Sequence, residues 1–253
     1  MIHQDPSGKW AGGVGSTIWD AGIVLARYFE HQVNEGSDCF EDVSILELGS
    51  GTGLCGLVLA HLGARITLTD RGMSMDLLKH NVQCSIPYSA RLAKNKDNKP
   101  PKVKLRELSW GDALYTTTQD SASQISNISS VSSDSKSSRR NGGPNGSTKS
   151  CCTVESDVEV DPDRAGVEET FDIVVGSDIV IWPELFQPLI DTLLKVTHAD
   201  TDVYLSYEER KTQVTEQFFN LLKLSFSYEV IPIEDLHPEY QDQGIKIYHI
   251  KRL

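Results

Sequence analysis

Cysteine is scarce in this sequence, and its arrangement excludes a disulfide-stapled scaffold. The 253 residues include five cysteines, an odd number, without a Cys-x-x-Cys pair or the usual Cys and His spacings of a zinc site. Disulfide frameworks usually have an even number of cysteines, and structural zinc sites usually have Cys and His at those spacings. We therefore expect reduced, structural thiols and no bound metal. The cysteines are Cys39, Cys55, Cys84, Cys151 and Cys152.

Long apolar runs are also missing. No stretch approaches the roughly 20 apolar residues that cross a bilayer. The opening residues, MIHQDPSGKWAGG, lack the basic and apolar regions of a signal peptide. We expect a soluble, monomeric intracellular protein without a membrane partner. Its expected location is the cytoplasm, and an additional nuclear location is left open.

Basic residues are outnumbered by acidic ones. The sequence holds 24 Lys and Arg against 36 Asp and Glu, a formal net charge of −12. Affinity for nucleic-acid phosphates depends on clustered Lys and Arg. Nucleic acid is therefore not expected as the main partner, and the acidic balance instead favours a basic one.

Aliphatic residues become rare in one internal segment, 116–170. Its first part is rich in Ser, Asn and Gly, SASQISNISSVSSDSKSSRRNGGPNGSTKS, and its second part is acidic, VESDVEVDPDRAGVEE. Such a composition cannot bury enough apolar surface to offset the entropy of ordering. We predict a single domain over residues 1–253 that is interrupted by a disordered, low-complexity insert at 116–170.

The chain is organised around a strand that runs directly into a glycine-rich turn, VSILELGSGTGL at 43–54. Its apolar first half is typical of a strand buried on both faces of a parallel sheet. The alternate glycines Gly49, Gly51 and Gly53 follow, and then an apolar helix. Glycines let the backbone turn sharply and let a ligand approach the N–H groups. The junction is therefore predicted to cradle a ligand at the carboxyl end of a strand.

Two acids indicate the nature of that ligand. Glu47 lies inside the strand, two residues before the first glycine, where a carboxylate repels a pyrophosphate but attracts an ammonium or sulfonium. Asp70 ends the next apolar strand, 65–69, and is placed to accept both hydroxyls of a ribose. The alternative is a buried turn with a helix-capping Asp70. The combination of the glycines with both acids disfavours it.

Apolar periodicity predicts alternating strands and helices along the rest of the chain. An amphipathic helix begins near Trp19, and a helix at 73–84 precedes a polar, basic loop at 85–101. This alternation, followed by a terminal strand pair, predicts an α/β fold with a doubly wound, mostly parallel sheet and one reversed strand. The predicted strands are 43–48, 65–69, 103–108, 171–177, 203–207, 228–233 and 245–250, and the later helices are 183–194 and 212–225.

These segments resemble the class I S-adenosylmethionine-dependent methyltransferases, a seven-β-strand superfamily. LELGSGTGL and LTD match its first two motifs. GSTIWDAGIVLARYFE, LSWGD, SDIV and LSYEER narrow the resemblance to methyltransferase family 16, the protein-lysine methyltransferases of the methyltransferase-like 21 type. The resemblance covers nearly the whole chain outside the insert. It implies a seven-stranded, Rossmann-like sheet with a C-terminal antiparallel strand, and S-adenosyl-L-methionine as the cofactor.

The resemblance also implies a role for each residue of the cofactor site. The glycine-rich turn is implied to cradle the cofactor by its backbone, Glu47 to engage its amino group and Asp70 to bind its ribose. The adenine is implied to lie against Trp110, with Asp112 beside its amine. The implied cofactor-binding residues are Trp19, Glu47, Gly49, Ser50, Gly51, Asp70, Trp110 and Ser177.

The methionyl end of the cofactor, where the methyl group is transferred, is implied to be closed by Trp19 and Ser177. Asp178 comes next and is the implied catalytic residue, because its charge would draw the ammonium of a lysine acceptor towards the methyl group. Capping of the following helix is the alternative role for Asp178. The family pattern at this place is Asp-x-x-Tyr, whereas this chain has Ile181 at the fourth position and Trp182 after it.

The implied substrate is a lysine-bearing, non-histone protein, a chaperone or a translation factor by resemblance to the family. Two alternatives stay open. A different acceptor, either another side chain or a small molecule, would use the same cofactor site. A cofactor-binding interaction module without turnover is the second alternative, which the missing tyrosine of the Asp-x-x-Tyr pattern favours.

Overall fold

The computed structural model of the chain describes residues 2–7, 13–36, 39–92, 101–111, 169–241 and 244–253. They belong to one compact unit that comprises residues 1–114 and 168–253. Residues 115–167 form a separate unit, which lies outside the described residues. The predicted disorder therefore stays a prediction for residues 116–168, whereas Glu169, which the prediction also included, is described and pairs with Arg106.

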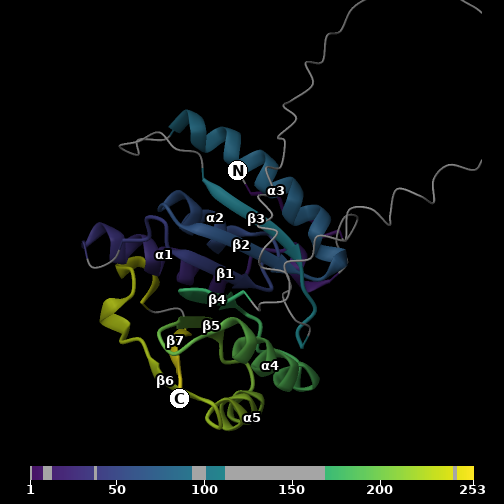
Figure 1. Cartoon of the computed structure of the whole chain (residues 1–253), viewed down its shortest axis with the longest axis vertical. Helices are drawn as coiled ribbons and strands as arrows, with labels where there is room; N and C mark the ends of the chain where they lie inside the picture. The colour runs from purple at the N-terminus through teal and green to yellow at the C-terminus, as the bar shows by residue number, and fades with distance from the viewer. Residues whose placement is uncertain (1, 8–12, 37–38, 93–100, 112–168, 242–243) are drawn as a thin grey trace, which may run out of the picture. The chain divides into compact units, whose positions relative to one another are not determined.

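A seven-stranded sheet forms the centre of the main unit, with the strand order β3-β2-β1-β4-β5-β7-β6 (Figure 1). Neighbouring strands from β3 to β5 are parallel, and β7 pairs antiparallel with both β5 and β6. The predicted doubly wound, mostly parallel sheet with one reversed strand is confirmed. Its strands are β1 (Ser44–Leu48), β2 (Arg65–Asp70), β3 (Lys102–Glu107), β4 (Ile173–Ser177), β5 (Asp202–Glu208), β6 (Phe226–Val230) and β7 (Ile245–Arg252).

Helices cover both faces of the sheet, and the two faces enclose separate apolar cores. Successive side chains of a strand point to opposite faces. Ile45 accordingly joins a core with α1, α2 and α3, whereas Leu46 and Leu48 join a core with α4 and α5. Figure 1 shows these two groups of helices apart from each other. The helices are α1 (Asp20–Asn34), α2 (Leu54–His61), α3 (Gly72–Leu92), α4 (Phe186–Val196) and α5 (Thr212–Leu222).

Helix α3 is longer than its apolar pattern predicts. The expected helix ends at Cys84 and a polar, basic loop follows at 85–101, but the helix continues to Leu92. Ser85 is buried and Ile86 packs against the core, so the inward face persists where the composition has already become polar. The loop prediction is wrong for residues 85–92, and residues 93–100 lie outside the described part of the chain.

Two further elements end earlier than predicted. The strand expected at 228–233 is β6, which ends at Val230, and Pro232 follows it. Proline cannot donate a ladder hydrogen bond, and the next residues form the 3-10 turn η4 (Ile233–Asp235). The helix expected at 212–225 is α5, which ends at Leu222.

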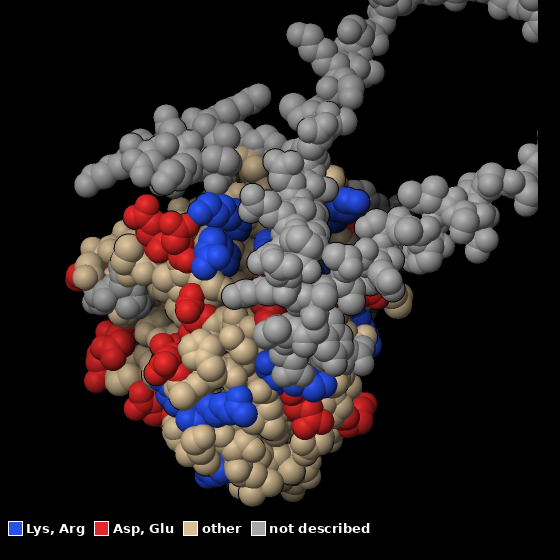
Figure 2. All heavy atoms as spheres, viewed as in Figure 1, with Lys and Arg blue, Asp and Glu red and all other residues tan. Residues whose placement is uncertain are grey.

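The surface of the main unit is charged without one sign prevailing on the visible face. Figure 2 shows acidic and basic side chains mixed over that face. Among the helices that the structure describes, none has the length and apolar character needed to cross a membrane.

The order in which the chain adds strands to the sheet reverses between the paired strands β1 and β4. From β1 the chain winds outwards through β2 to β3, and then it returns to β4 and winds to β5 on the other side. Doubly wound sheets bind ligands outside the carboxyl ends of their strands at such a switch point. The fold therefore predicts a ligand site among the residues that follow β1, β2 and β4.

Candidate active site

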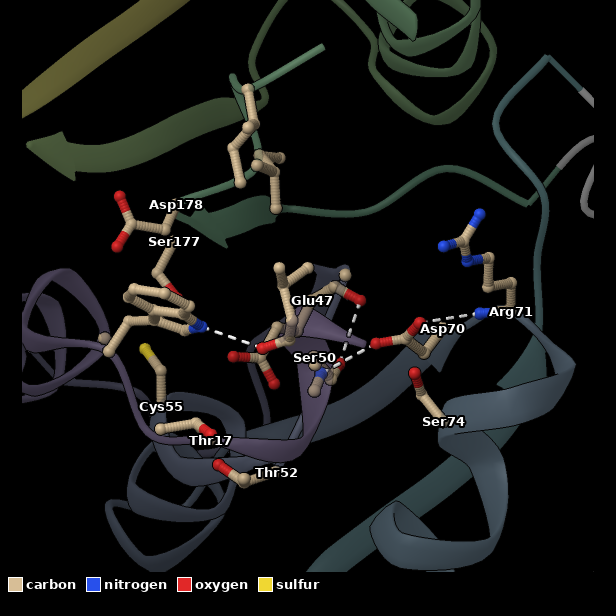
Figure 3. A pocket seen from close by; sticks show the side chains of 18 of the residues that line it. Thr17, Glu47, Ser50, Thr52, Cys55, Asp70, Arg71, Ser74, Ser177 and Asp178 are labelled. Carbon is tan, nitrogen blue, oxygen red and sulfur yellow. Dashed lines mark hydrogen bonds between the residues drawn. The ribbon is translucent and has the colours of Figure 1, made fainter. Parts of the chain in front are cut away.

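A cavity of about 360 Å³ opens at the carboxyl ends of β1, β2 and β4 (Figure 3). It is lined by the segment before α1, the glycine-rich turn, the end of β2 and the residues that follow β3 and β4. Nine of the residues predicted to bind the cofactor or the acceptor lie on its wall, while their individual roles stay predictions. These residues are Trp19, Glu47, Gly49, Ser50, Gly51, Asp70, Trp110, Ser177 and Asp178.

The turn after β1 needs glycine to keep its shape. Gly49 and Gly51 have φ angles of 63° and 53°, in the left-handed region that other residues rarely adopt. A Cβ atom on Gly51 would also lie 2.9 Å from the carbonyl oxygen of Gly15, which lines the cavity as well. A larger residue at Gly51 would therefore push the turn away from the segment before α1 and change the shape of the cavity.

The Asp70 carboxylate is bonded to this turn. Its Oδ2 accepts the N–H of Gly51 at 2.7 Å, and its Oδ1 accepts the N–H of Arg71 at 2.8 Å (Figure 3). A carboxylate has about four acceptor positions, so it retains capacity for hydroxyl donors in the cavity. Asp70 thus orders the glycine-rich turn and presents oxygen atoms to a ligand at the same time.

Glu47 is a buried carboxyl group beneath the turn. It points to the same sheet face as Ile45, and only 2% of the residue is exposed. Its Oε2 accepts the N–H of Gly56, in the first turn of α2, at 3.2 Å. Burial raises the pKa of Glu47 from 4.5 to about 8, and hydrogen bonds from Ser50 and Gly56 oppose the rise only in part. The group is therefore largely protonated at neutral pH, and a cation in the cavity would favour its ionisation.

Two of the predicted residues, Trp19 and Trp110, contribute indole rings to the cavity wall. The Nε1–H of Trp19 donates to the carbonyl of Val14 at 2.8 Å, and 38% of Trp19 is exposed. Trp110 packs against the core, and a Cβ atom on Gly49 would lie 3.4 Å from its Cζ2, so its ring reaches over the glycine-rich turn. A flat apolar surface at that place suits an aromatic ligand group. Asp112, the predicted companion of Trp110, lies outside the described residues.

Asp178 follows β4 in an unusual backbone conformation. Its φ angle is 51°, which is uncommon for a residue with a Cβ, and its N–H donates to the carbonyl of Ser206 at 2.8 Å. The carboxylate accepts the N–H of Glu208 at 3.4 Å and the Nη2 of Arg210 at 3.2 Å. Burial raises the pKa of Asp178, although Arg210 and the Glu208 N–H oppose the rise. The alternative role as a helix cap is not seen, because the 3-10 turn η3 (Pro183–Leu185) that follows has no side-chain cap.

Arg210 contacts this site without having been singled out from the sequence. Its guanidinium carbon lies 5.0 Å from the centroid of the Trp19 ring, which is a cation–π contact. Its Nε donates to Glu208 Oε2 at 3.1 Å. Together with the bond to Asp178, these contacts join the start of α1 to the end of β4. The partners lie far apart in the chain, so the only signal for Arg210 is its place in the LSYEER segment.

Other residues of the cavity wall were also missed. Thr17, Arg71 and Ser74 line the cavity beside predicted residues, and that closeness in sequence is their only signal. Ile181 and Trp182 lie on the wall too. This part of the wall is therefore apolar and aromatic where the Asp-x-x-Tyr pattern has a phenol.

Comparison with known proteins adds a family match. The profile of the lysine methyltransferase family matches residues 4–125 and 158–225. Protein N-lysine methyltransferase METTL21A of Xenopus tropicalis is 28% identical over 215 residues, which cover 85% of this chain and 70% of that protein. The METTL21A protein of Mus musculus is 40% identical over 102 residues, 40% of this chain and 41% of that protein. EEF1A lysine methyltransferase 3 of Xenopus tropicalis is 25% identical over 241 residues, 95% of this chain and 76% of that protein.

Proposed function

The chain belongs to the lysine methyltransferase family, and we propose that it methylates a lysine side chain of a non-histone protein at this cavity. S-adenosyl-L-methionine is the methyl donor of the family's reaction. One observation supports the proposal: nine residues predicted for the site line a single cavity. When bound, the cofactor supplies a sulfonium methyl group for in-line transfer, so the protein's task is to position the two reactants and to exclude water.

The chemistry of the wall suits each part of the cofactor. The Glu47 carboxyl group, whose pKa burial raises to about 8, would ionise against the amino group of the cofactor. The Asp70 oxygen atoms, which the N–H groups of Gly51 and Arg71 already hold in place, would accept the ribose hydroxyls. The Trp110 ring would cover the adenine. Trp19 and Ser177 would enclose the methionyl end.

A lysine acceptor must lose its proton before it can attack the methyl group. With an ordinary pKa near 10.4, about one amine in a thousand is neutral at cellular pH, and neutralising the amine costs roughly 4 kcal/mol. Desolvation and a neighbouring positive charge both lower the pKa of an amine. The apolar wall at Trp19, Ile181 and Trp182 would supply the first effect, and the sulfonium would supply the second. This wall supports a lysine acceptor even without the phenol of the family pattern.

The substrate is proposed to be a soluble protein met in the cytoplasm by a monomeric enzyme. One relative is EEF1A lysine methyltransferase 3, so elongation factor 1A is the first protein to test. A chaperone is the second choice, from the resemblance of the sequence to the family. The net charge of −12 favours a basic substrate surface.

Transfer of a labelled methyl group into a cell extract tests the proposal. We expect the full chain to label a discrete protein band. Asp70→Ala should abolish the band, whereas Asp235→Ala, which changes an exposed acid outside the cavity, should leave it unchanged. Label in a soluble small product would favour a different acceptor. Absence of label despite cofactor binding would favour an interaction module.

A further inference from the structure

A cluster of metal-ligand side chains lies outside the cavity, where the segment 2–7 meets α3. His80 and Cys84 are four residues apart and share one face of the helix, with Cys84 Sγ 3.6 Å from His80 Nε2. The imidazole of His3 lies edge-on to that of His80, with ring centroids 4.7 Å apart. One ligand atom from each of the three residues lies within 4.8 Å of the others.

The fold itself holds His3 at this place. Asn81, a fully buried residue of α3, accepts the N–H of His3 with its Oδ1 at 2.7 Å and donates to the His3 carbonyl with its Nδ2 at 3.0 Å. Two hydrogen bonds between one buried amide and one backbone residue fix both the position and the direction of that residue. The two hydrogen bonds to Asn81 therefore hold His3 against α3.

The three donor atoms suit Zn²⁺. Zinc binds Cys sulfur at about 2.3 Å and His nitrogen at about 2.0–2.1 Å in tetrahedral geometry, which sets the ligand atoms roughly 3.3–3.6 Å apart. Cys84 and His80 already have this separation, at 3.6 Å. The ligand atom of His3 lies within 4.8 Å of the other two. It would have to move by roughly 1 Å to reach the zinc separation. Because His3 is exposed, the fourth position is open to water.

The cluster is connected to the cofactor cavity by two contacts. Asn81 Nδ2 also donates to the carbonyl of Thr52 at 2.9 Å, and Thr52 belongs to the glycine-rich turn that lines the cavity. Ile18, on another part of the cavity wall, donates its N–H to Gln4 Oε1 at 2.9 Å. Fastening the segment 2–7 to α3 would therefore restrain both parts of the wall.

We propose that His3, His80 and Cys84 bind Zn²⁺, and that the ion fastens the N-terminal segment to α3 and thereby tightens the cofactor cavity. The ion takes no part in methyl transfer, because none of its three ligands lines the cavity. The spacing of His80 and Cys84 is a chelating pattern that the Cys-x-x-Cys rule overlooks, and His3 joins the pair only in the folded chain. An ion that binds only the folded state also raises its stability.

Titration of the full chain with Co²⁺ tests the site through the absorption spectrum of the bound ion, without an activity measurement. A tetrahedral cobalt–thiolate site gives intense visible absorption and a near-ultraviolet charge-transfer band, and Zn²⁺ then displaces both. We expect one bound equivalent with this spectrum, and its loss in Cys84→Ser and in His3→Gln. A triple variant that carries Cys39→Ser, Cys151→Ser and Cys152→Ser lacks three other thiols of the chain and should retain the cobalt spectrum. A spectrum that survives Cys84→Ser, or one without the thiolate band, would overturn the site.

The effect on the cavity is measured separately, by calorimetry with S-adenosyl-L-methionine. We expect Zn²⁺ to tighten cofactor binding by about fivefold, the lower end of coupling between distinct sites. His3→Gln changes an exposed side chain, so it should fold with the metal-free melting temperature of the wild type and show no such gain. Equal cofactor affinity of the wild type with and without Zn²⁺ would overturn the coupling.

Discussion

Asp178 and Arg210 form an ion pair beside the cavity, with Arg210 Nη2 3.2 Å from Asp178 Oδ2. The acid is almost completely buried, whereas 42% of the Arg210 side chain is exposed, so the pair has one fixed partner and one movable partner. The guanidinium also stacks on Trp19. An incoming lysine ammonium therefore has to compete with a cation that the protein already supplies.

Asp178→Asn should reduce methyl transfer by at least about tenfold, because a hydrogen bond to a charged group contributes about 1.5–3 kcal/mol. The amide keeps the shape of the side chain and can still accept a hydrogen bond from Arg210, but it no longer attracts an ammonium. Steady-state kinetics measure the loss, and calorimetry should find cofactor affinity within about threefold of the wild type. Asp191→Asn, on α4 and outside the cavity, is the matched control. Unchanged transfer by Asp178→Asn would remove Asp178 from the mechanism.

Ile181→Tyr restores the family's Asp-x-x-Tyr pattern. Ile181 is half-buried and lines the cavity, and a phenol oxygen there would accept a hydrogen bond from the acceptor amine. We expect turnover to be retained or raised, as measured by the rate of label transfer at saturating cofactor. A clear fall in turnover would show that this wall is shaped around the Ile181 and Trp182 pair instead.

The cofactor half of the site could be predicted from short segments of sequence. Glu47, Gly51 and Asp70 lie within or directly after the strands β1 and β2, and their positions follow from local apolar patterns. The carboxyl ends of neighbouring parallel strands meet at one edge of the sheet. The sheet topology alone therefore predicts that these residues lie together, and no side-chain contact has to be known in advance.

Contacts between distant segments could not be predicted in the same way. Arg210 meets Trp19 and Asp178 only in the folded chain, and no periodicity in the sequence signals such a meeting. The extension of α3 beyond Cys84 is a related case. The packing of Ile86 against the core continues the helix there, although the polar composition of the segment indicates a loop.

Asp70→Ala should weaken S-adenosyl-L-methionine binding by about 10- to 100-fold, from the loss of charged hydrogen bonds to the ribose and of the bond that orders Gly51. Gly51→Val should block the cradle altogether, because its Cβ would meet the Gly15 carbonyl oxygen. Calorimetry measures both affinities. Asp76→Ala, an exposed acid on α3, should bind normally. Tight binding of NAD without any response to the methyl donor would contradict the cofactor assignment.

Glu47 should make the folded state less stable as pH rises. Its folded-state pKa of about 8 exceeds its ordinary value of 4.5, so between these values the folded chain keeps a proton that the unfolded chain has released. The free energy of unfolding should fall across this window by roughly 4–5 kcal/mol on account of this buried group. Glu47→Gln cannot ionise. Its stability relative to the wild type should therefore rise steadily from pH 4.5 to about 8.

Denaturant unfolding of both proteins at several pH values measures this difference. The test is independent of methyl transfer, because it needs neither cofactor nor substrate. A stability difference that does not change with pH would show that Glu47 is not held protonated in the folded chain.

Replacing residues 118–163 with a short Gly/Ser linker should leave the melting temperature and the cofactor affinity nearly unchanged. The family profile itself passes over residues between 125 and 158. Loop-closure entropy also varies only slowly with loop length. At the far end of the segment, Glu169 Oε2 lies 2.6 Å from Arg106 Nη1, so the flank is anchored independently. Calorimetric scanning that found a loss of cooperative unfolding would show that the segment packs on the domain.

The most direct measurement of the central claim is the position of the transferred methyl group. The full chain is incubated with a deuterated-methyl cofactor and either elongation factor 1A or extract, and the products are mapped by tandem mass spectrometry. We expect the labelled methyl group on a lysine ε-nitrogen, absent with Asp70→Ala and strongly reduced with Asp178→Asn. Label found only on small molecules or on other side chains would contradict the proposal that this chain methylates protein lysine.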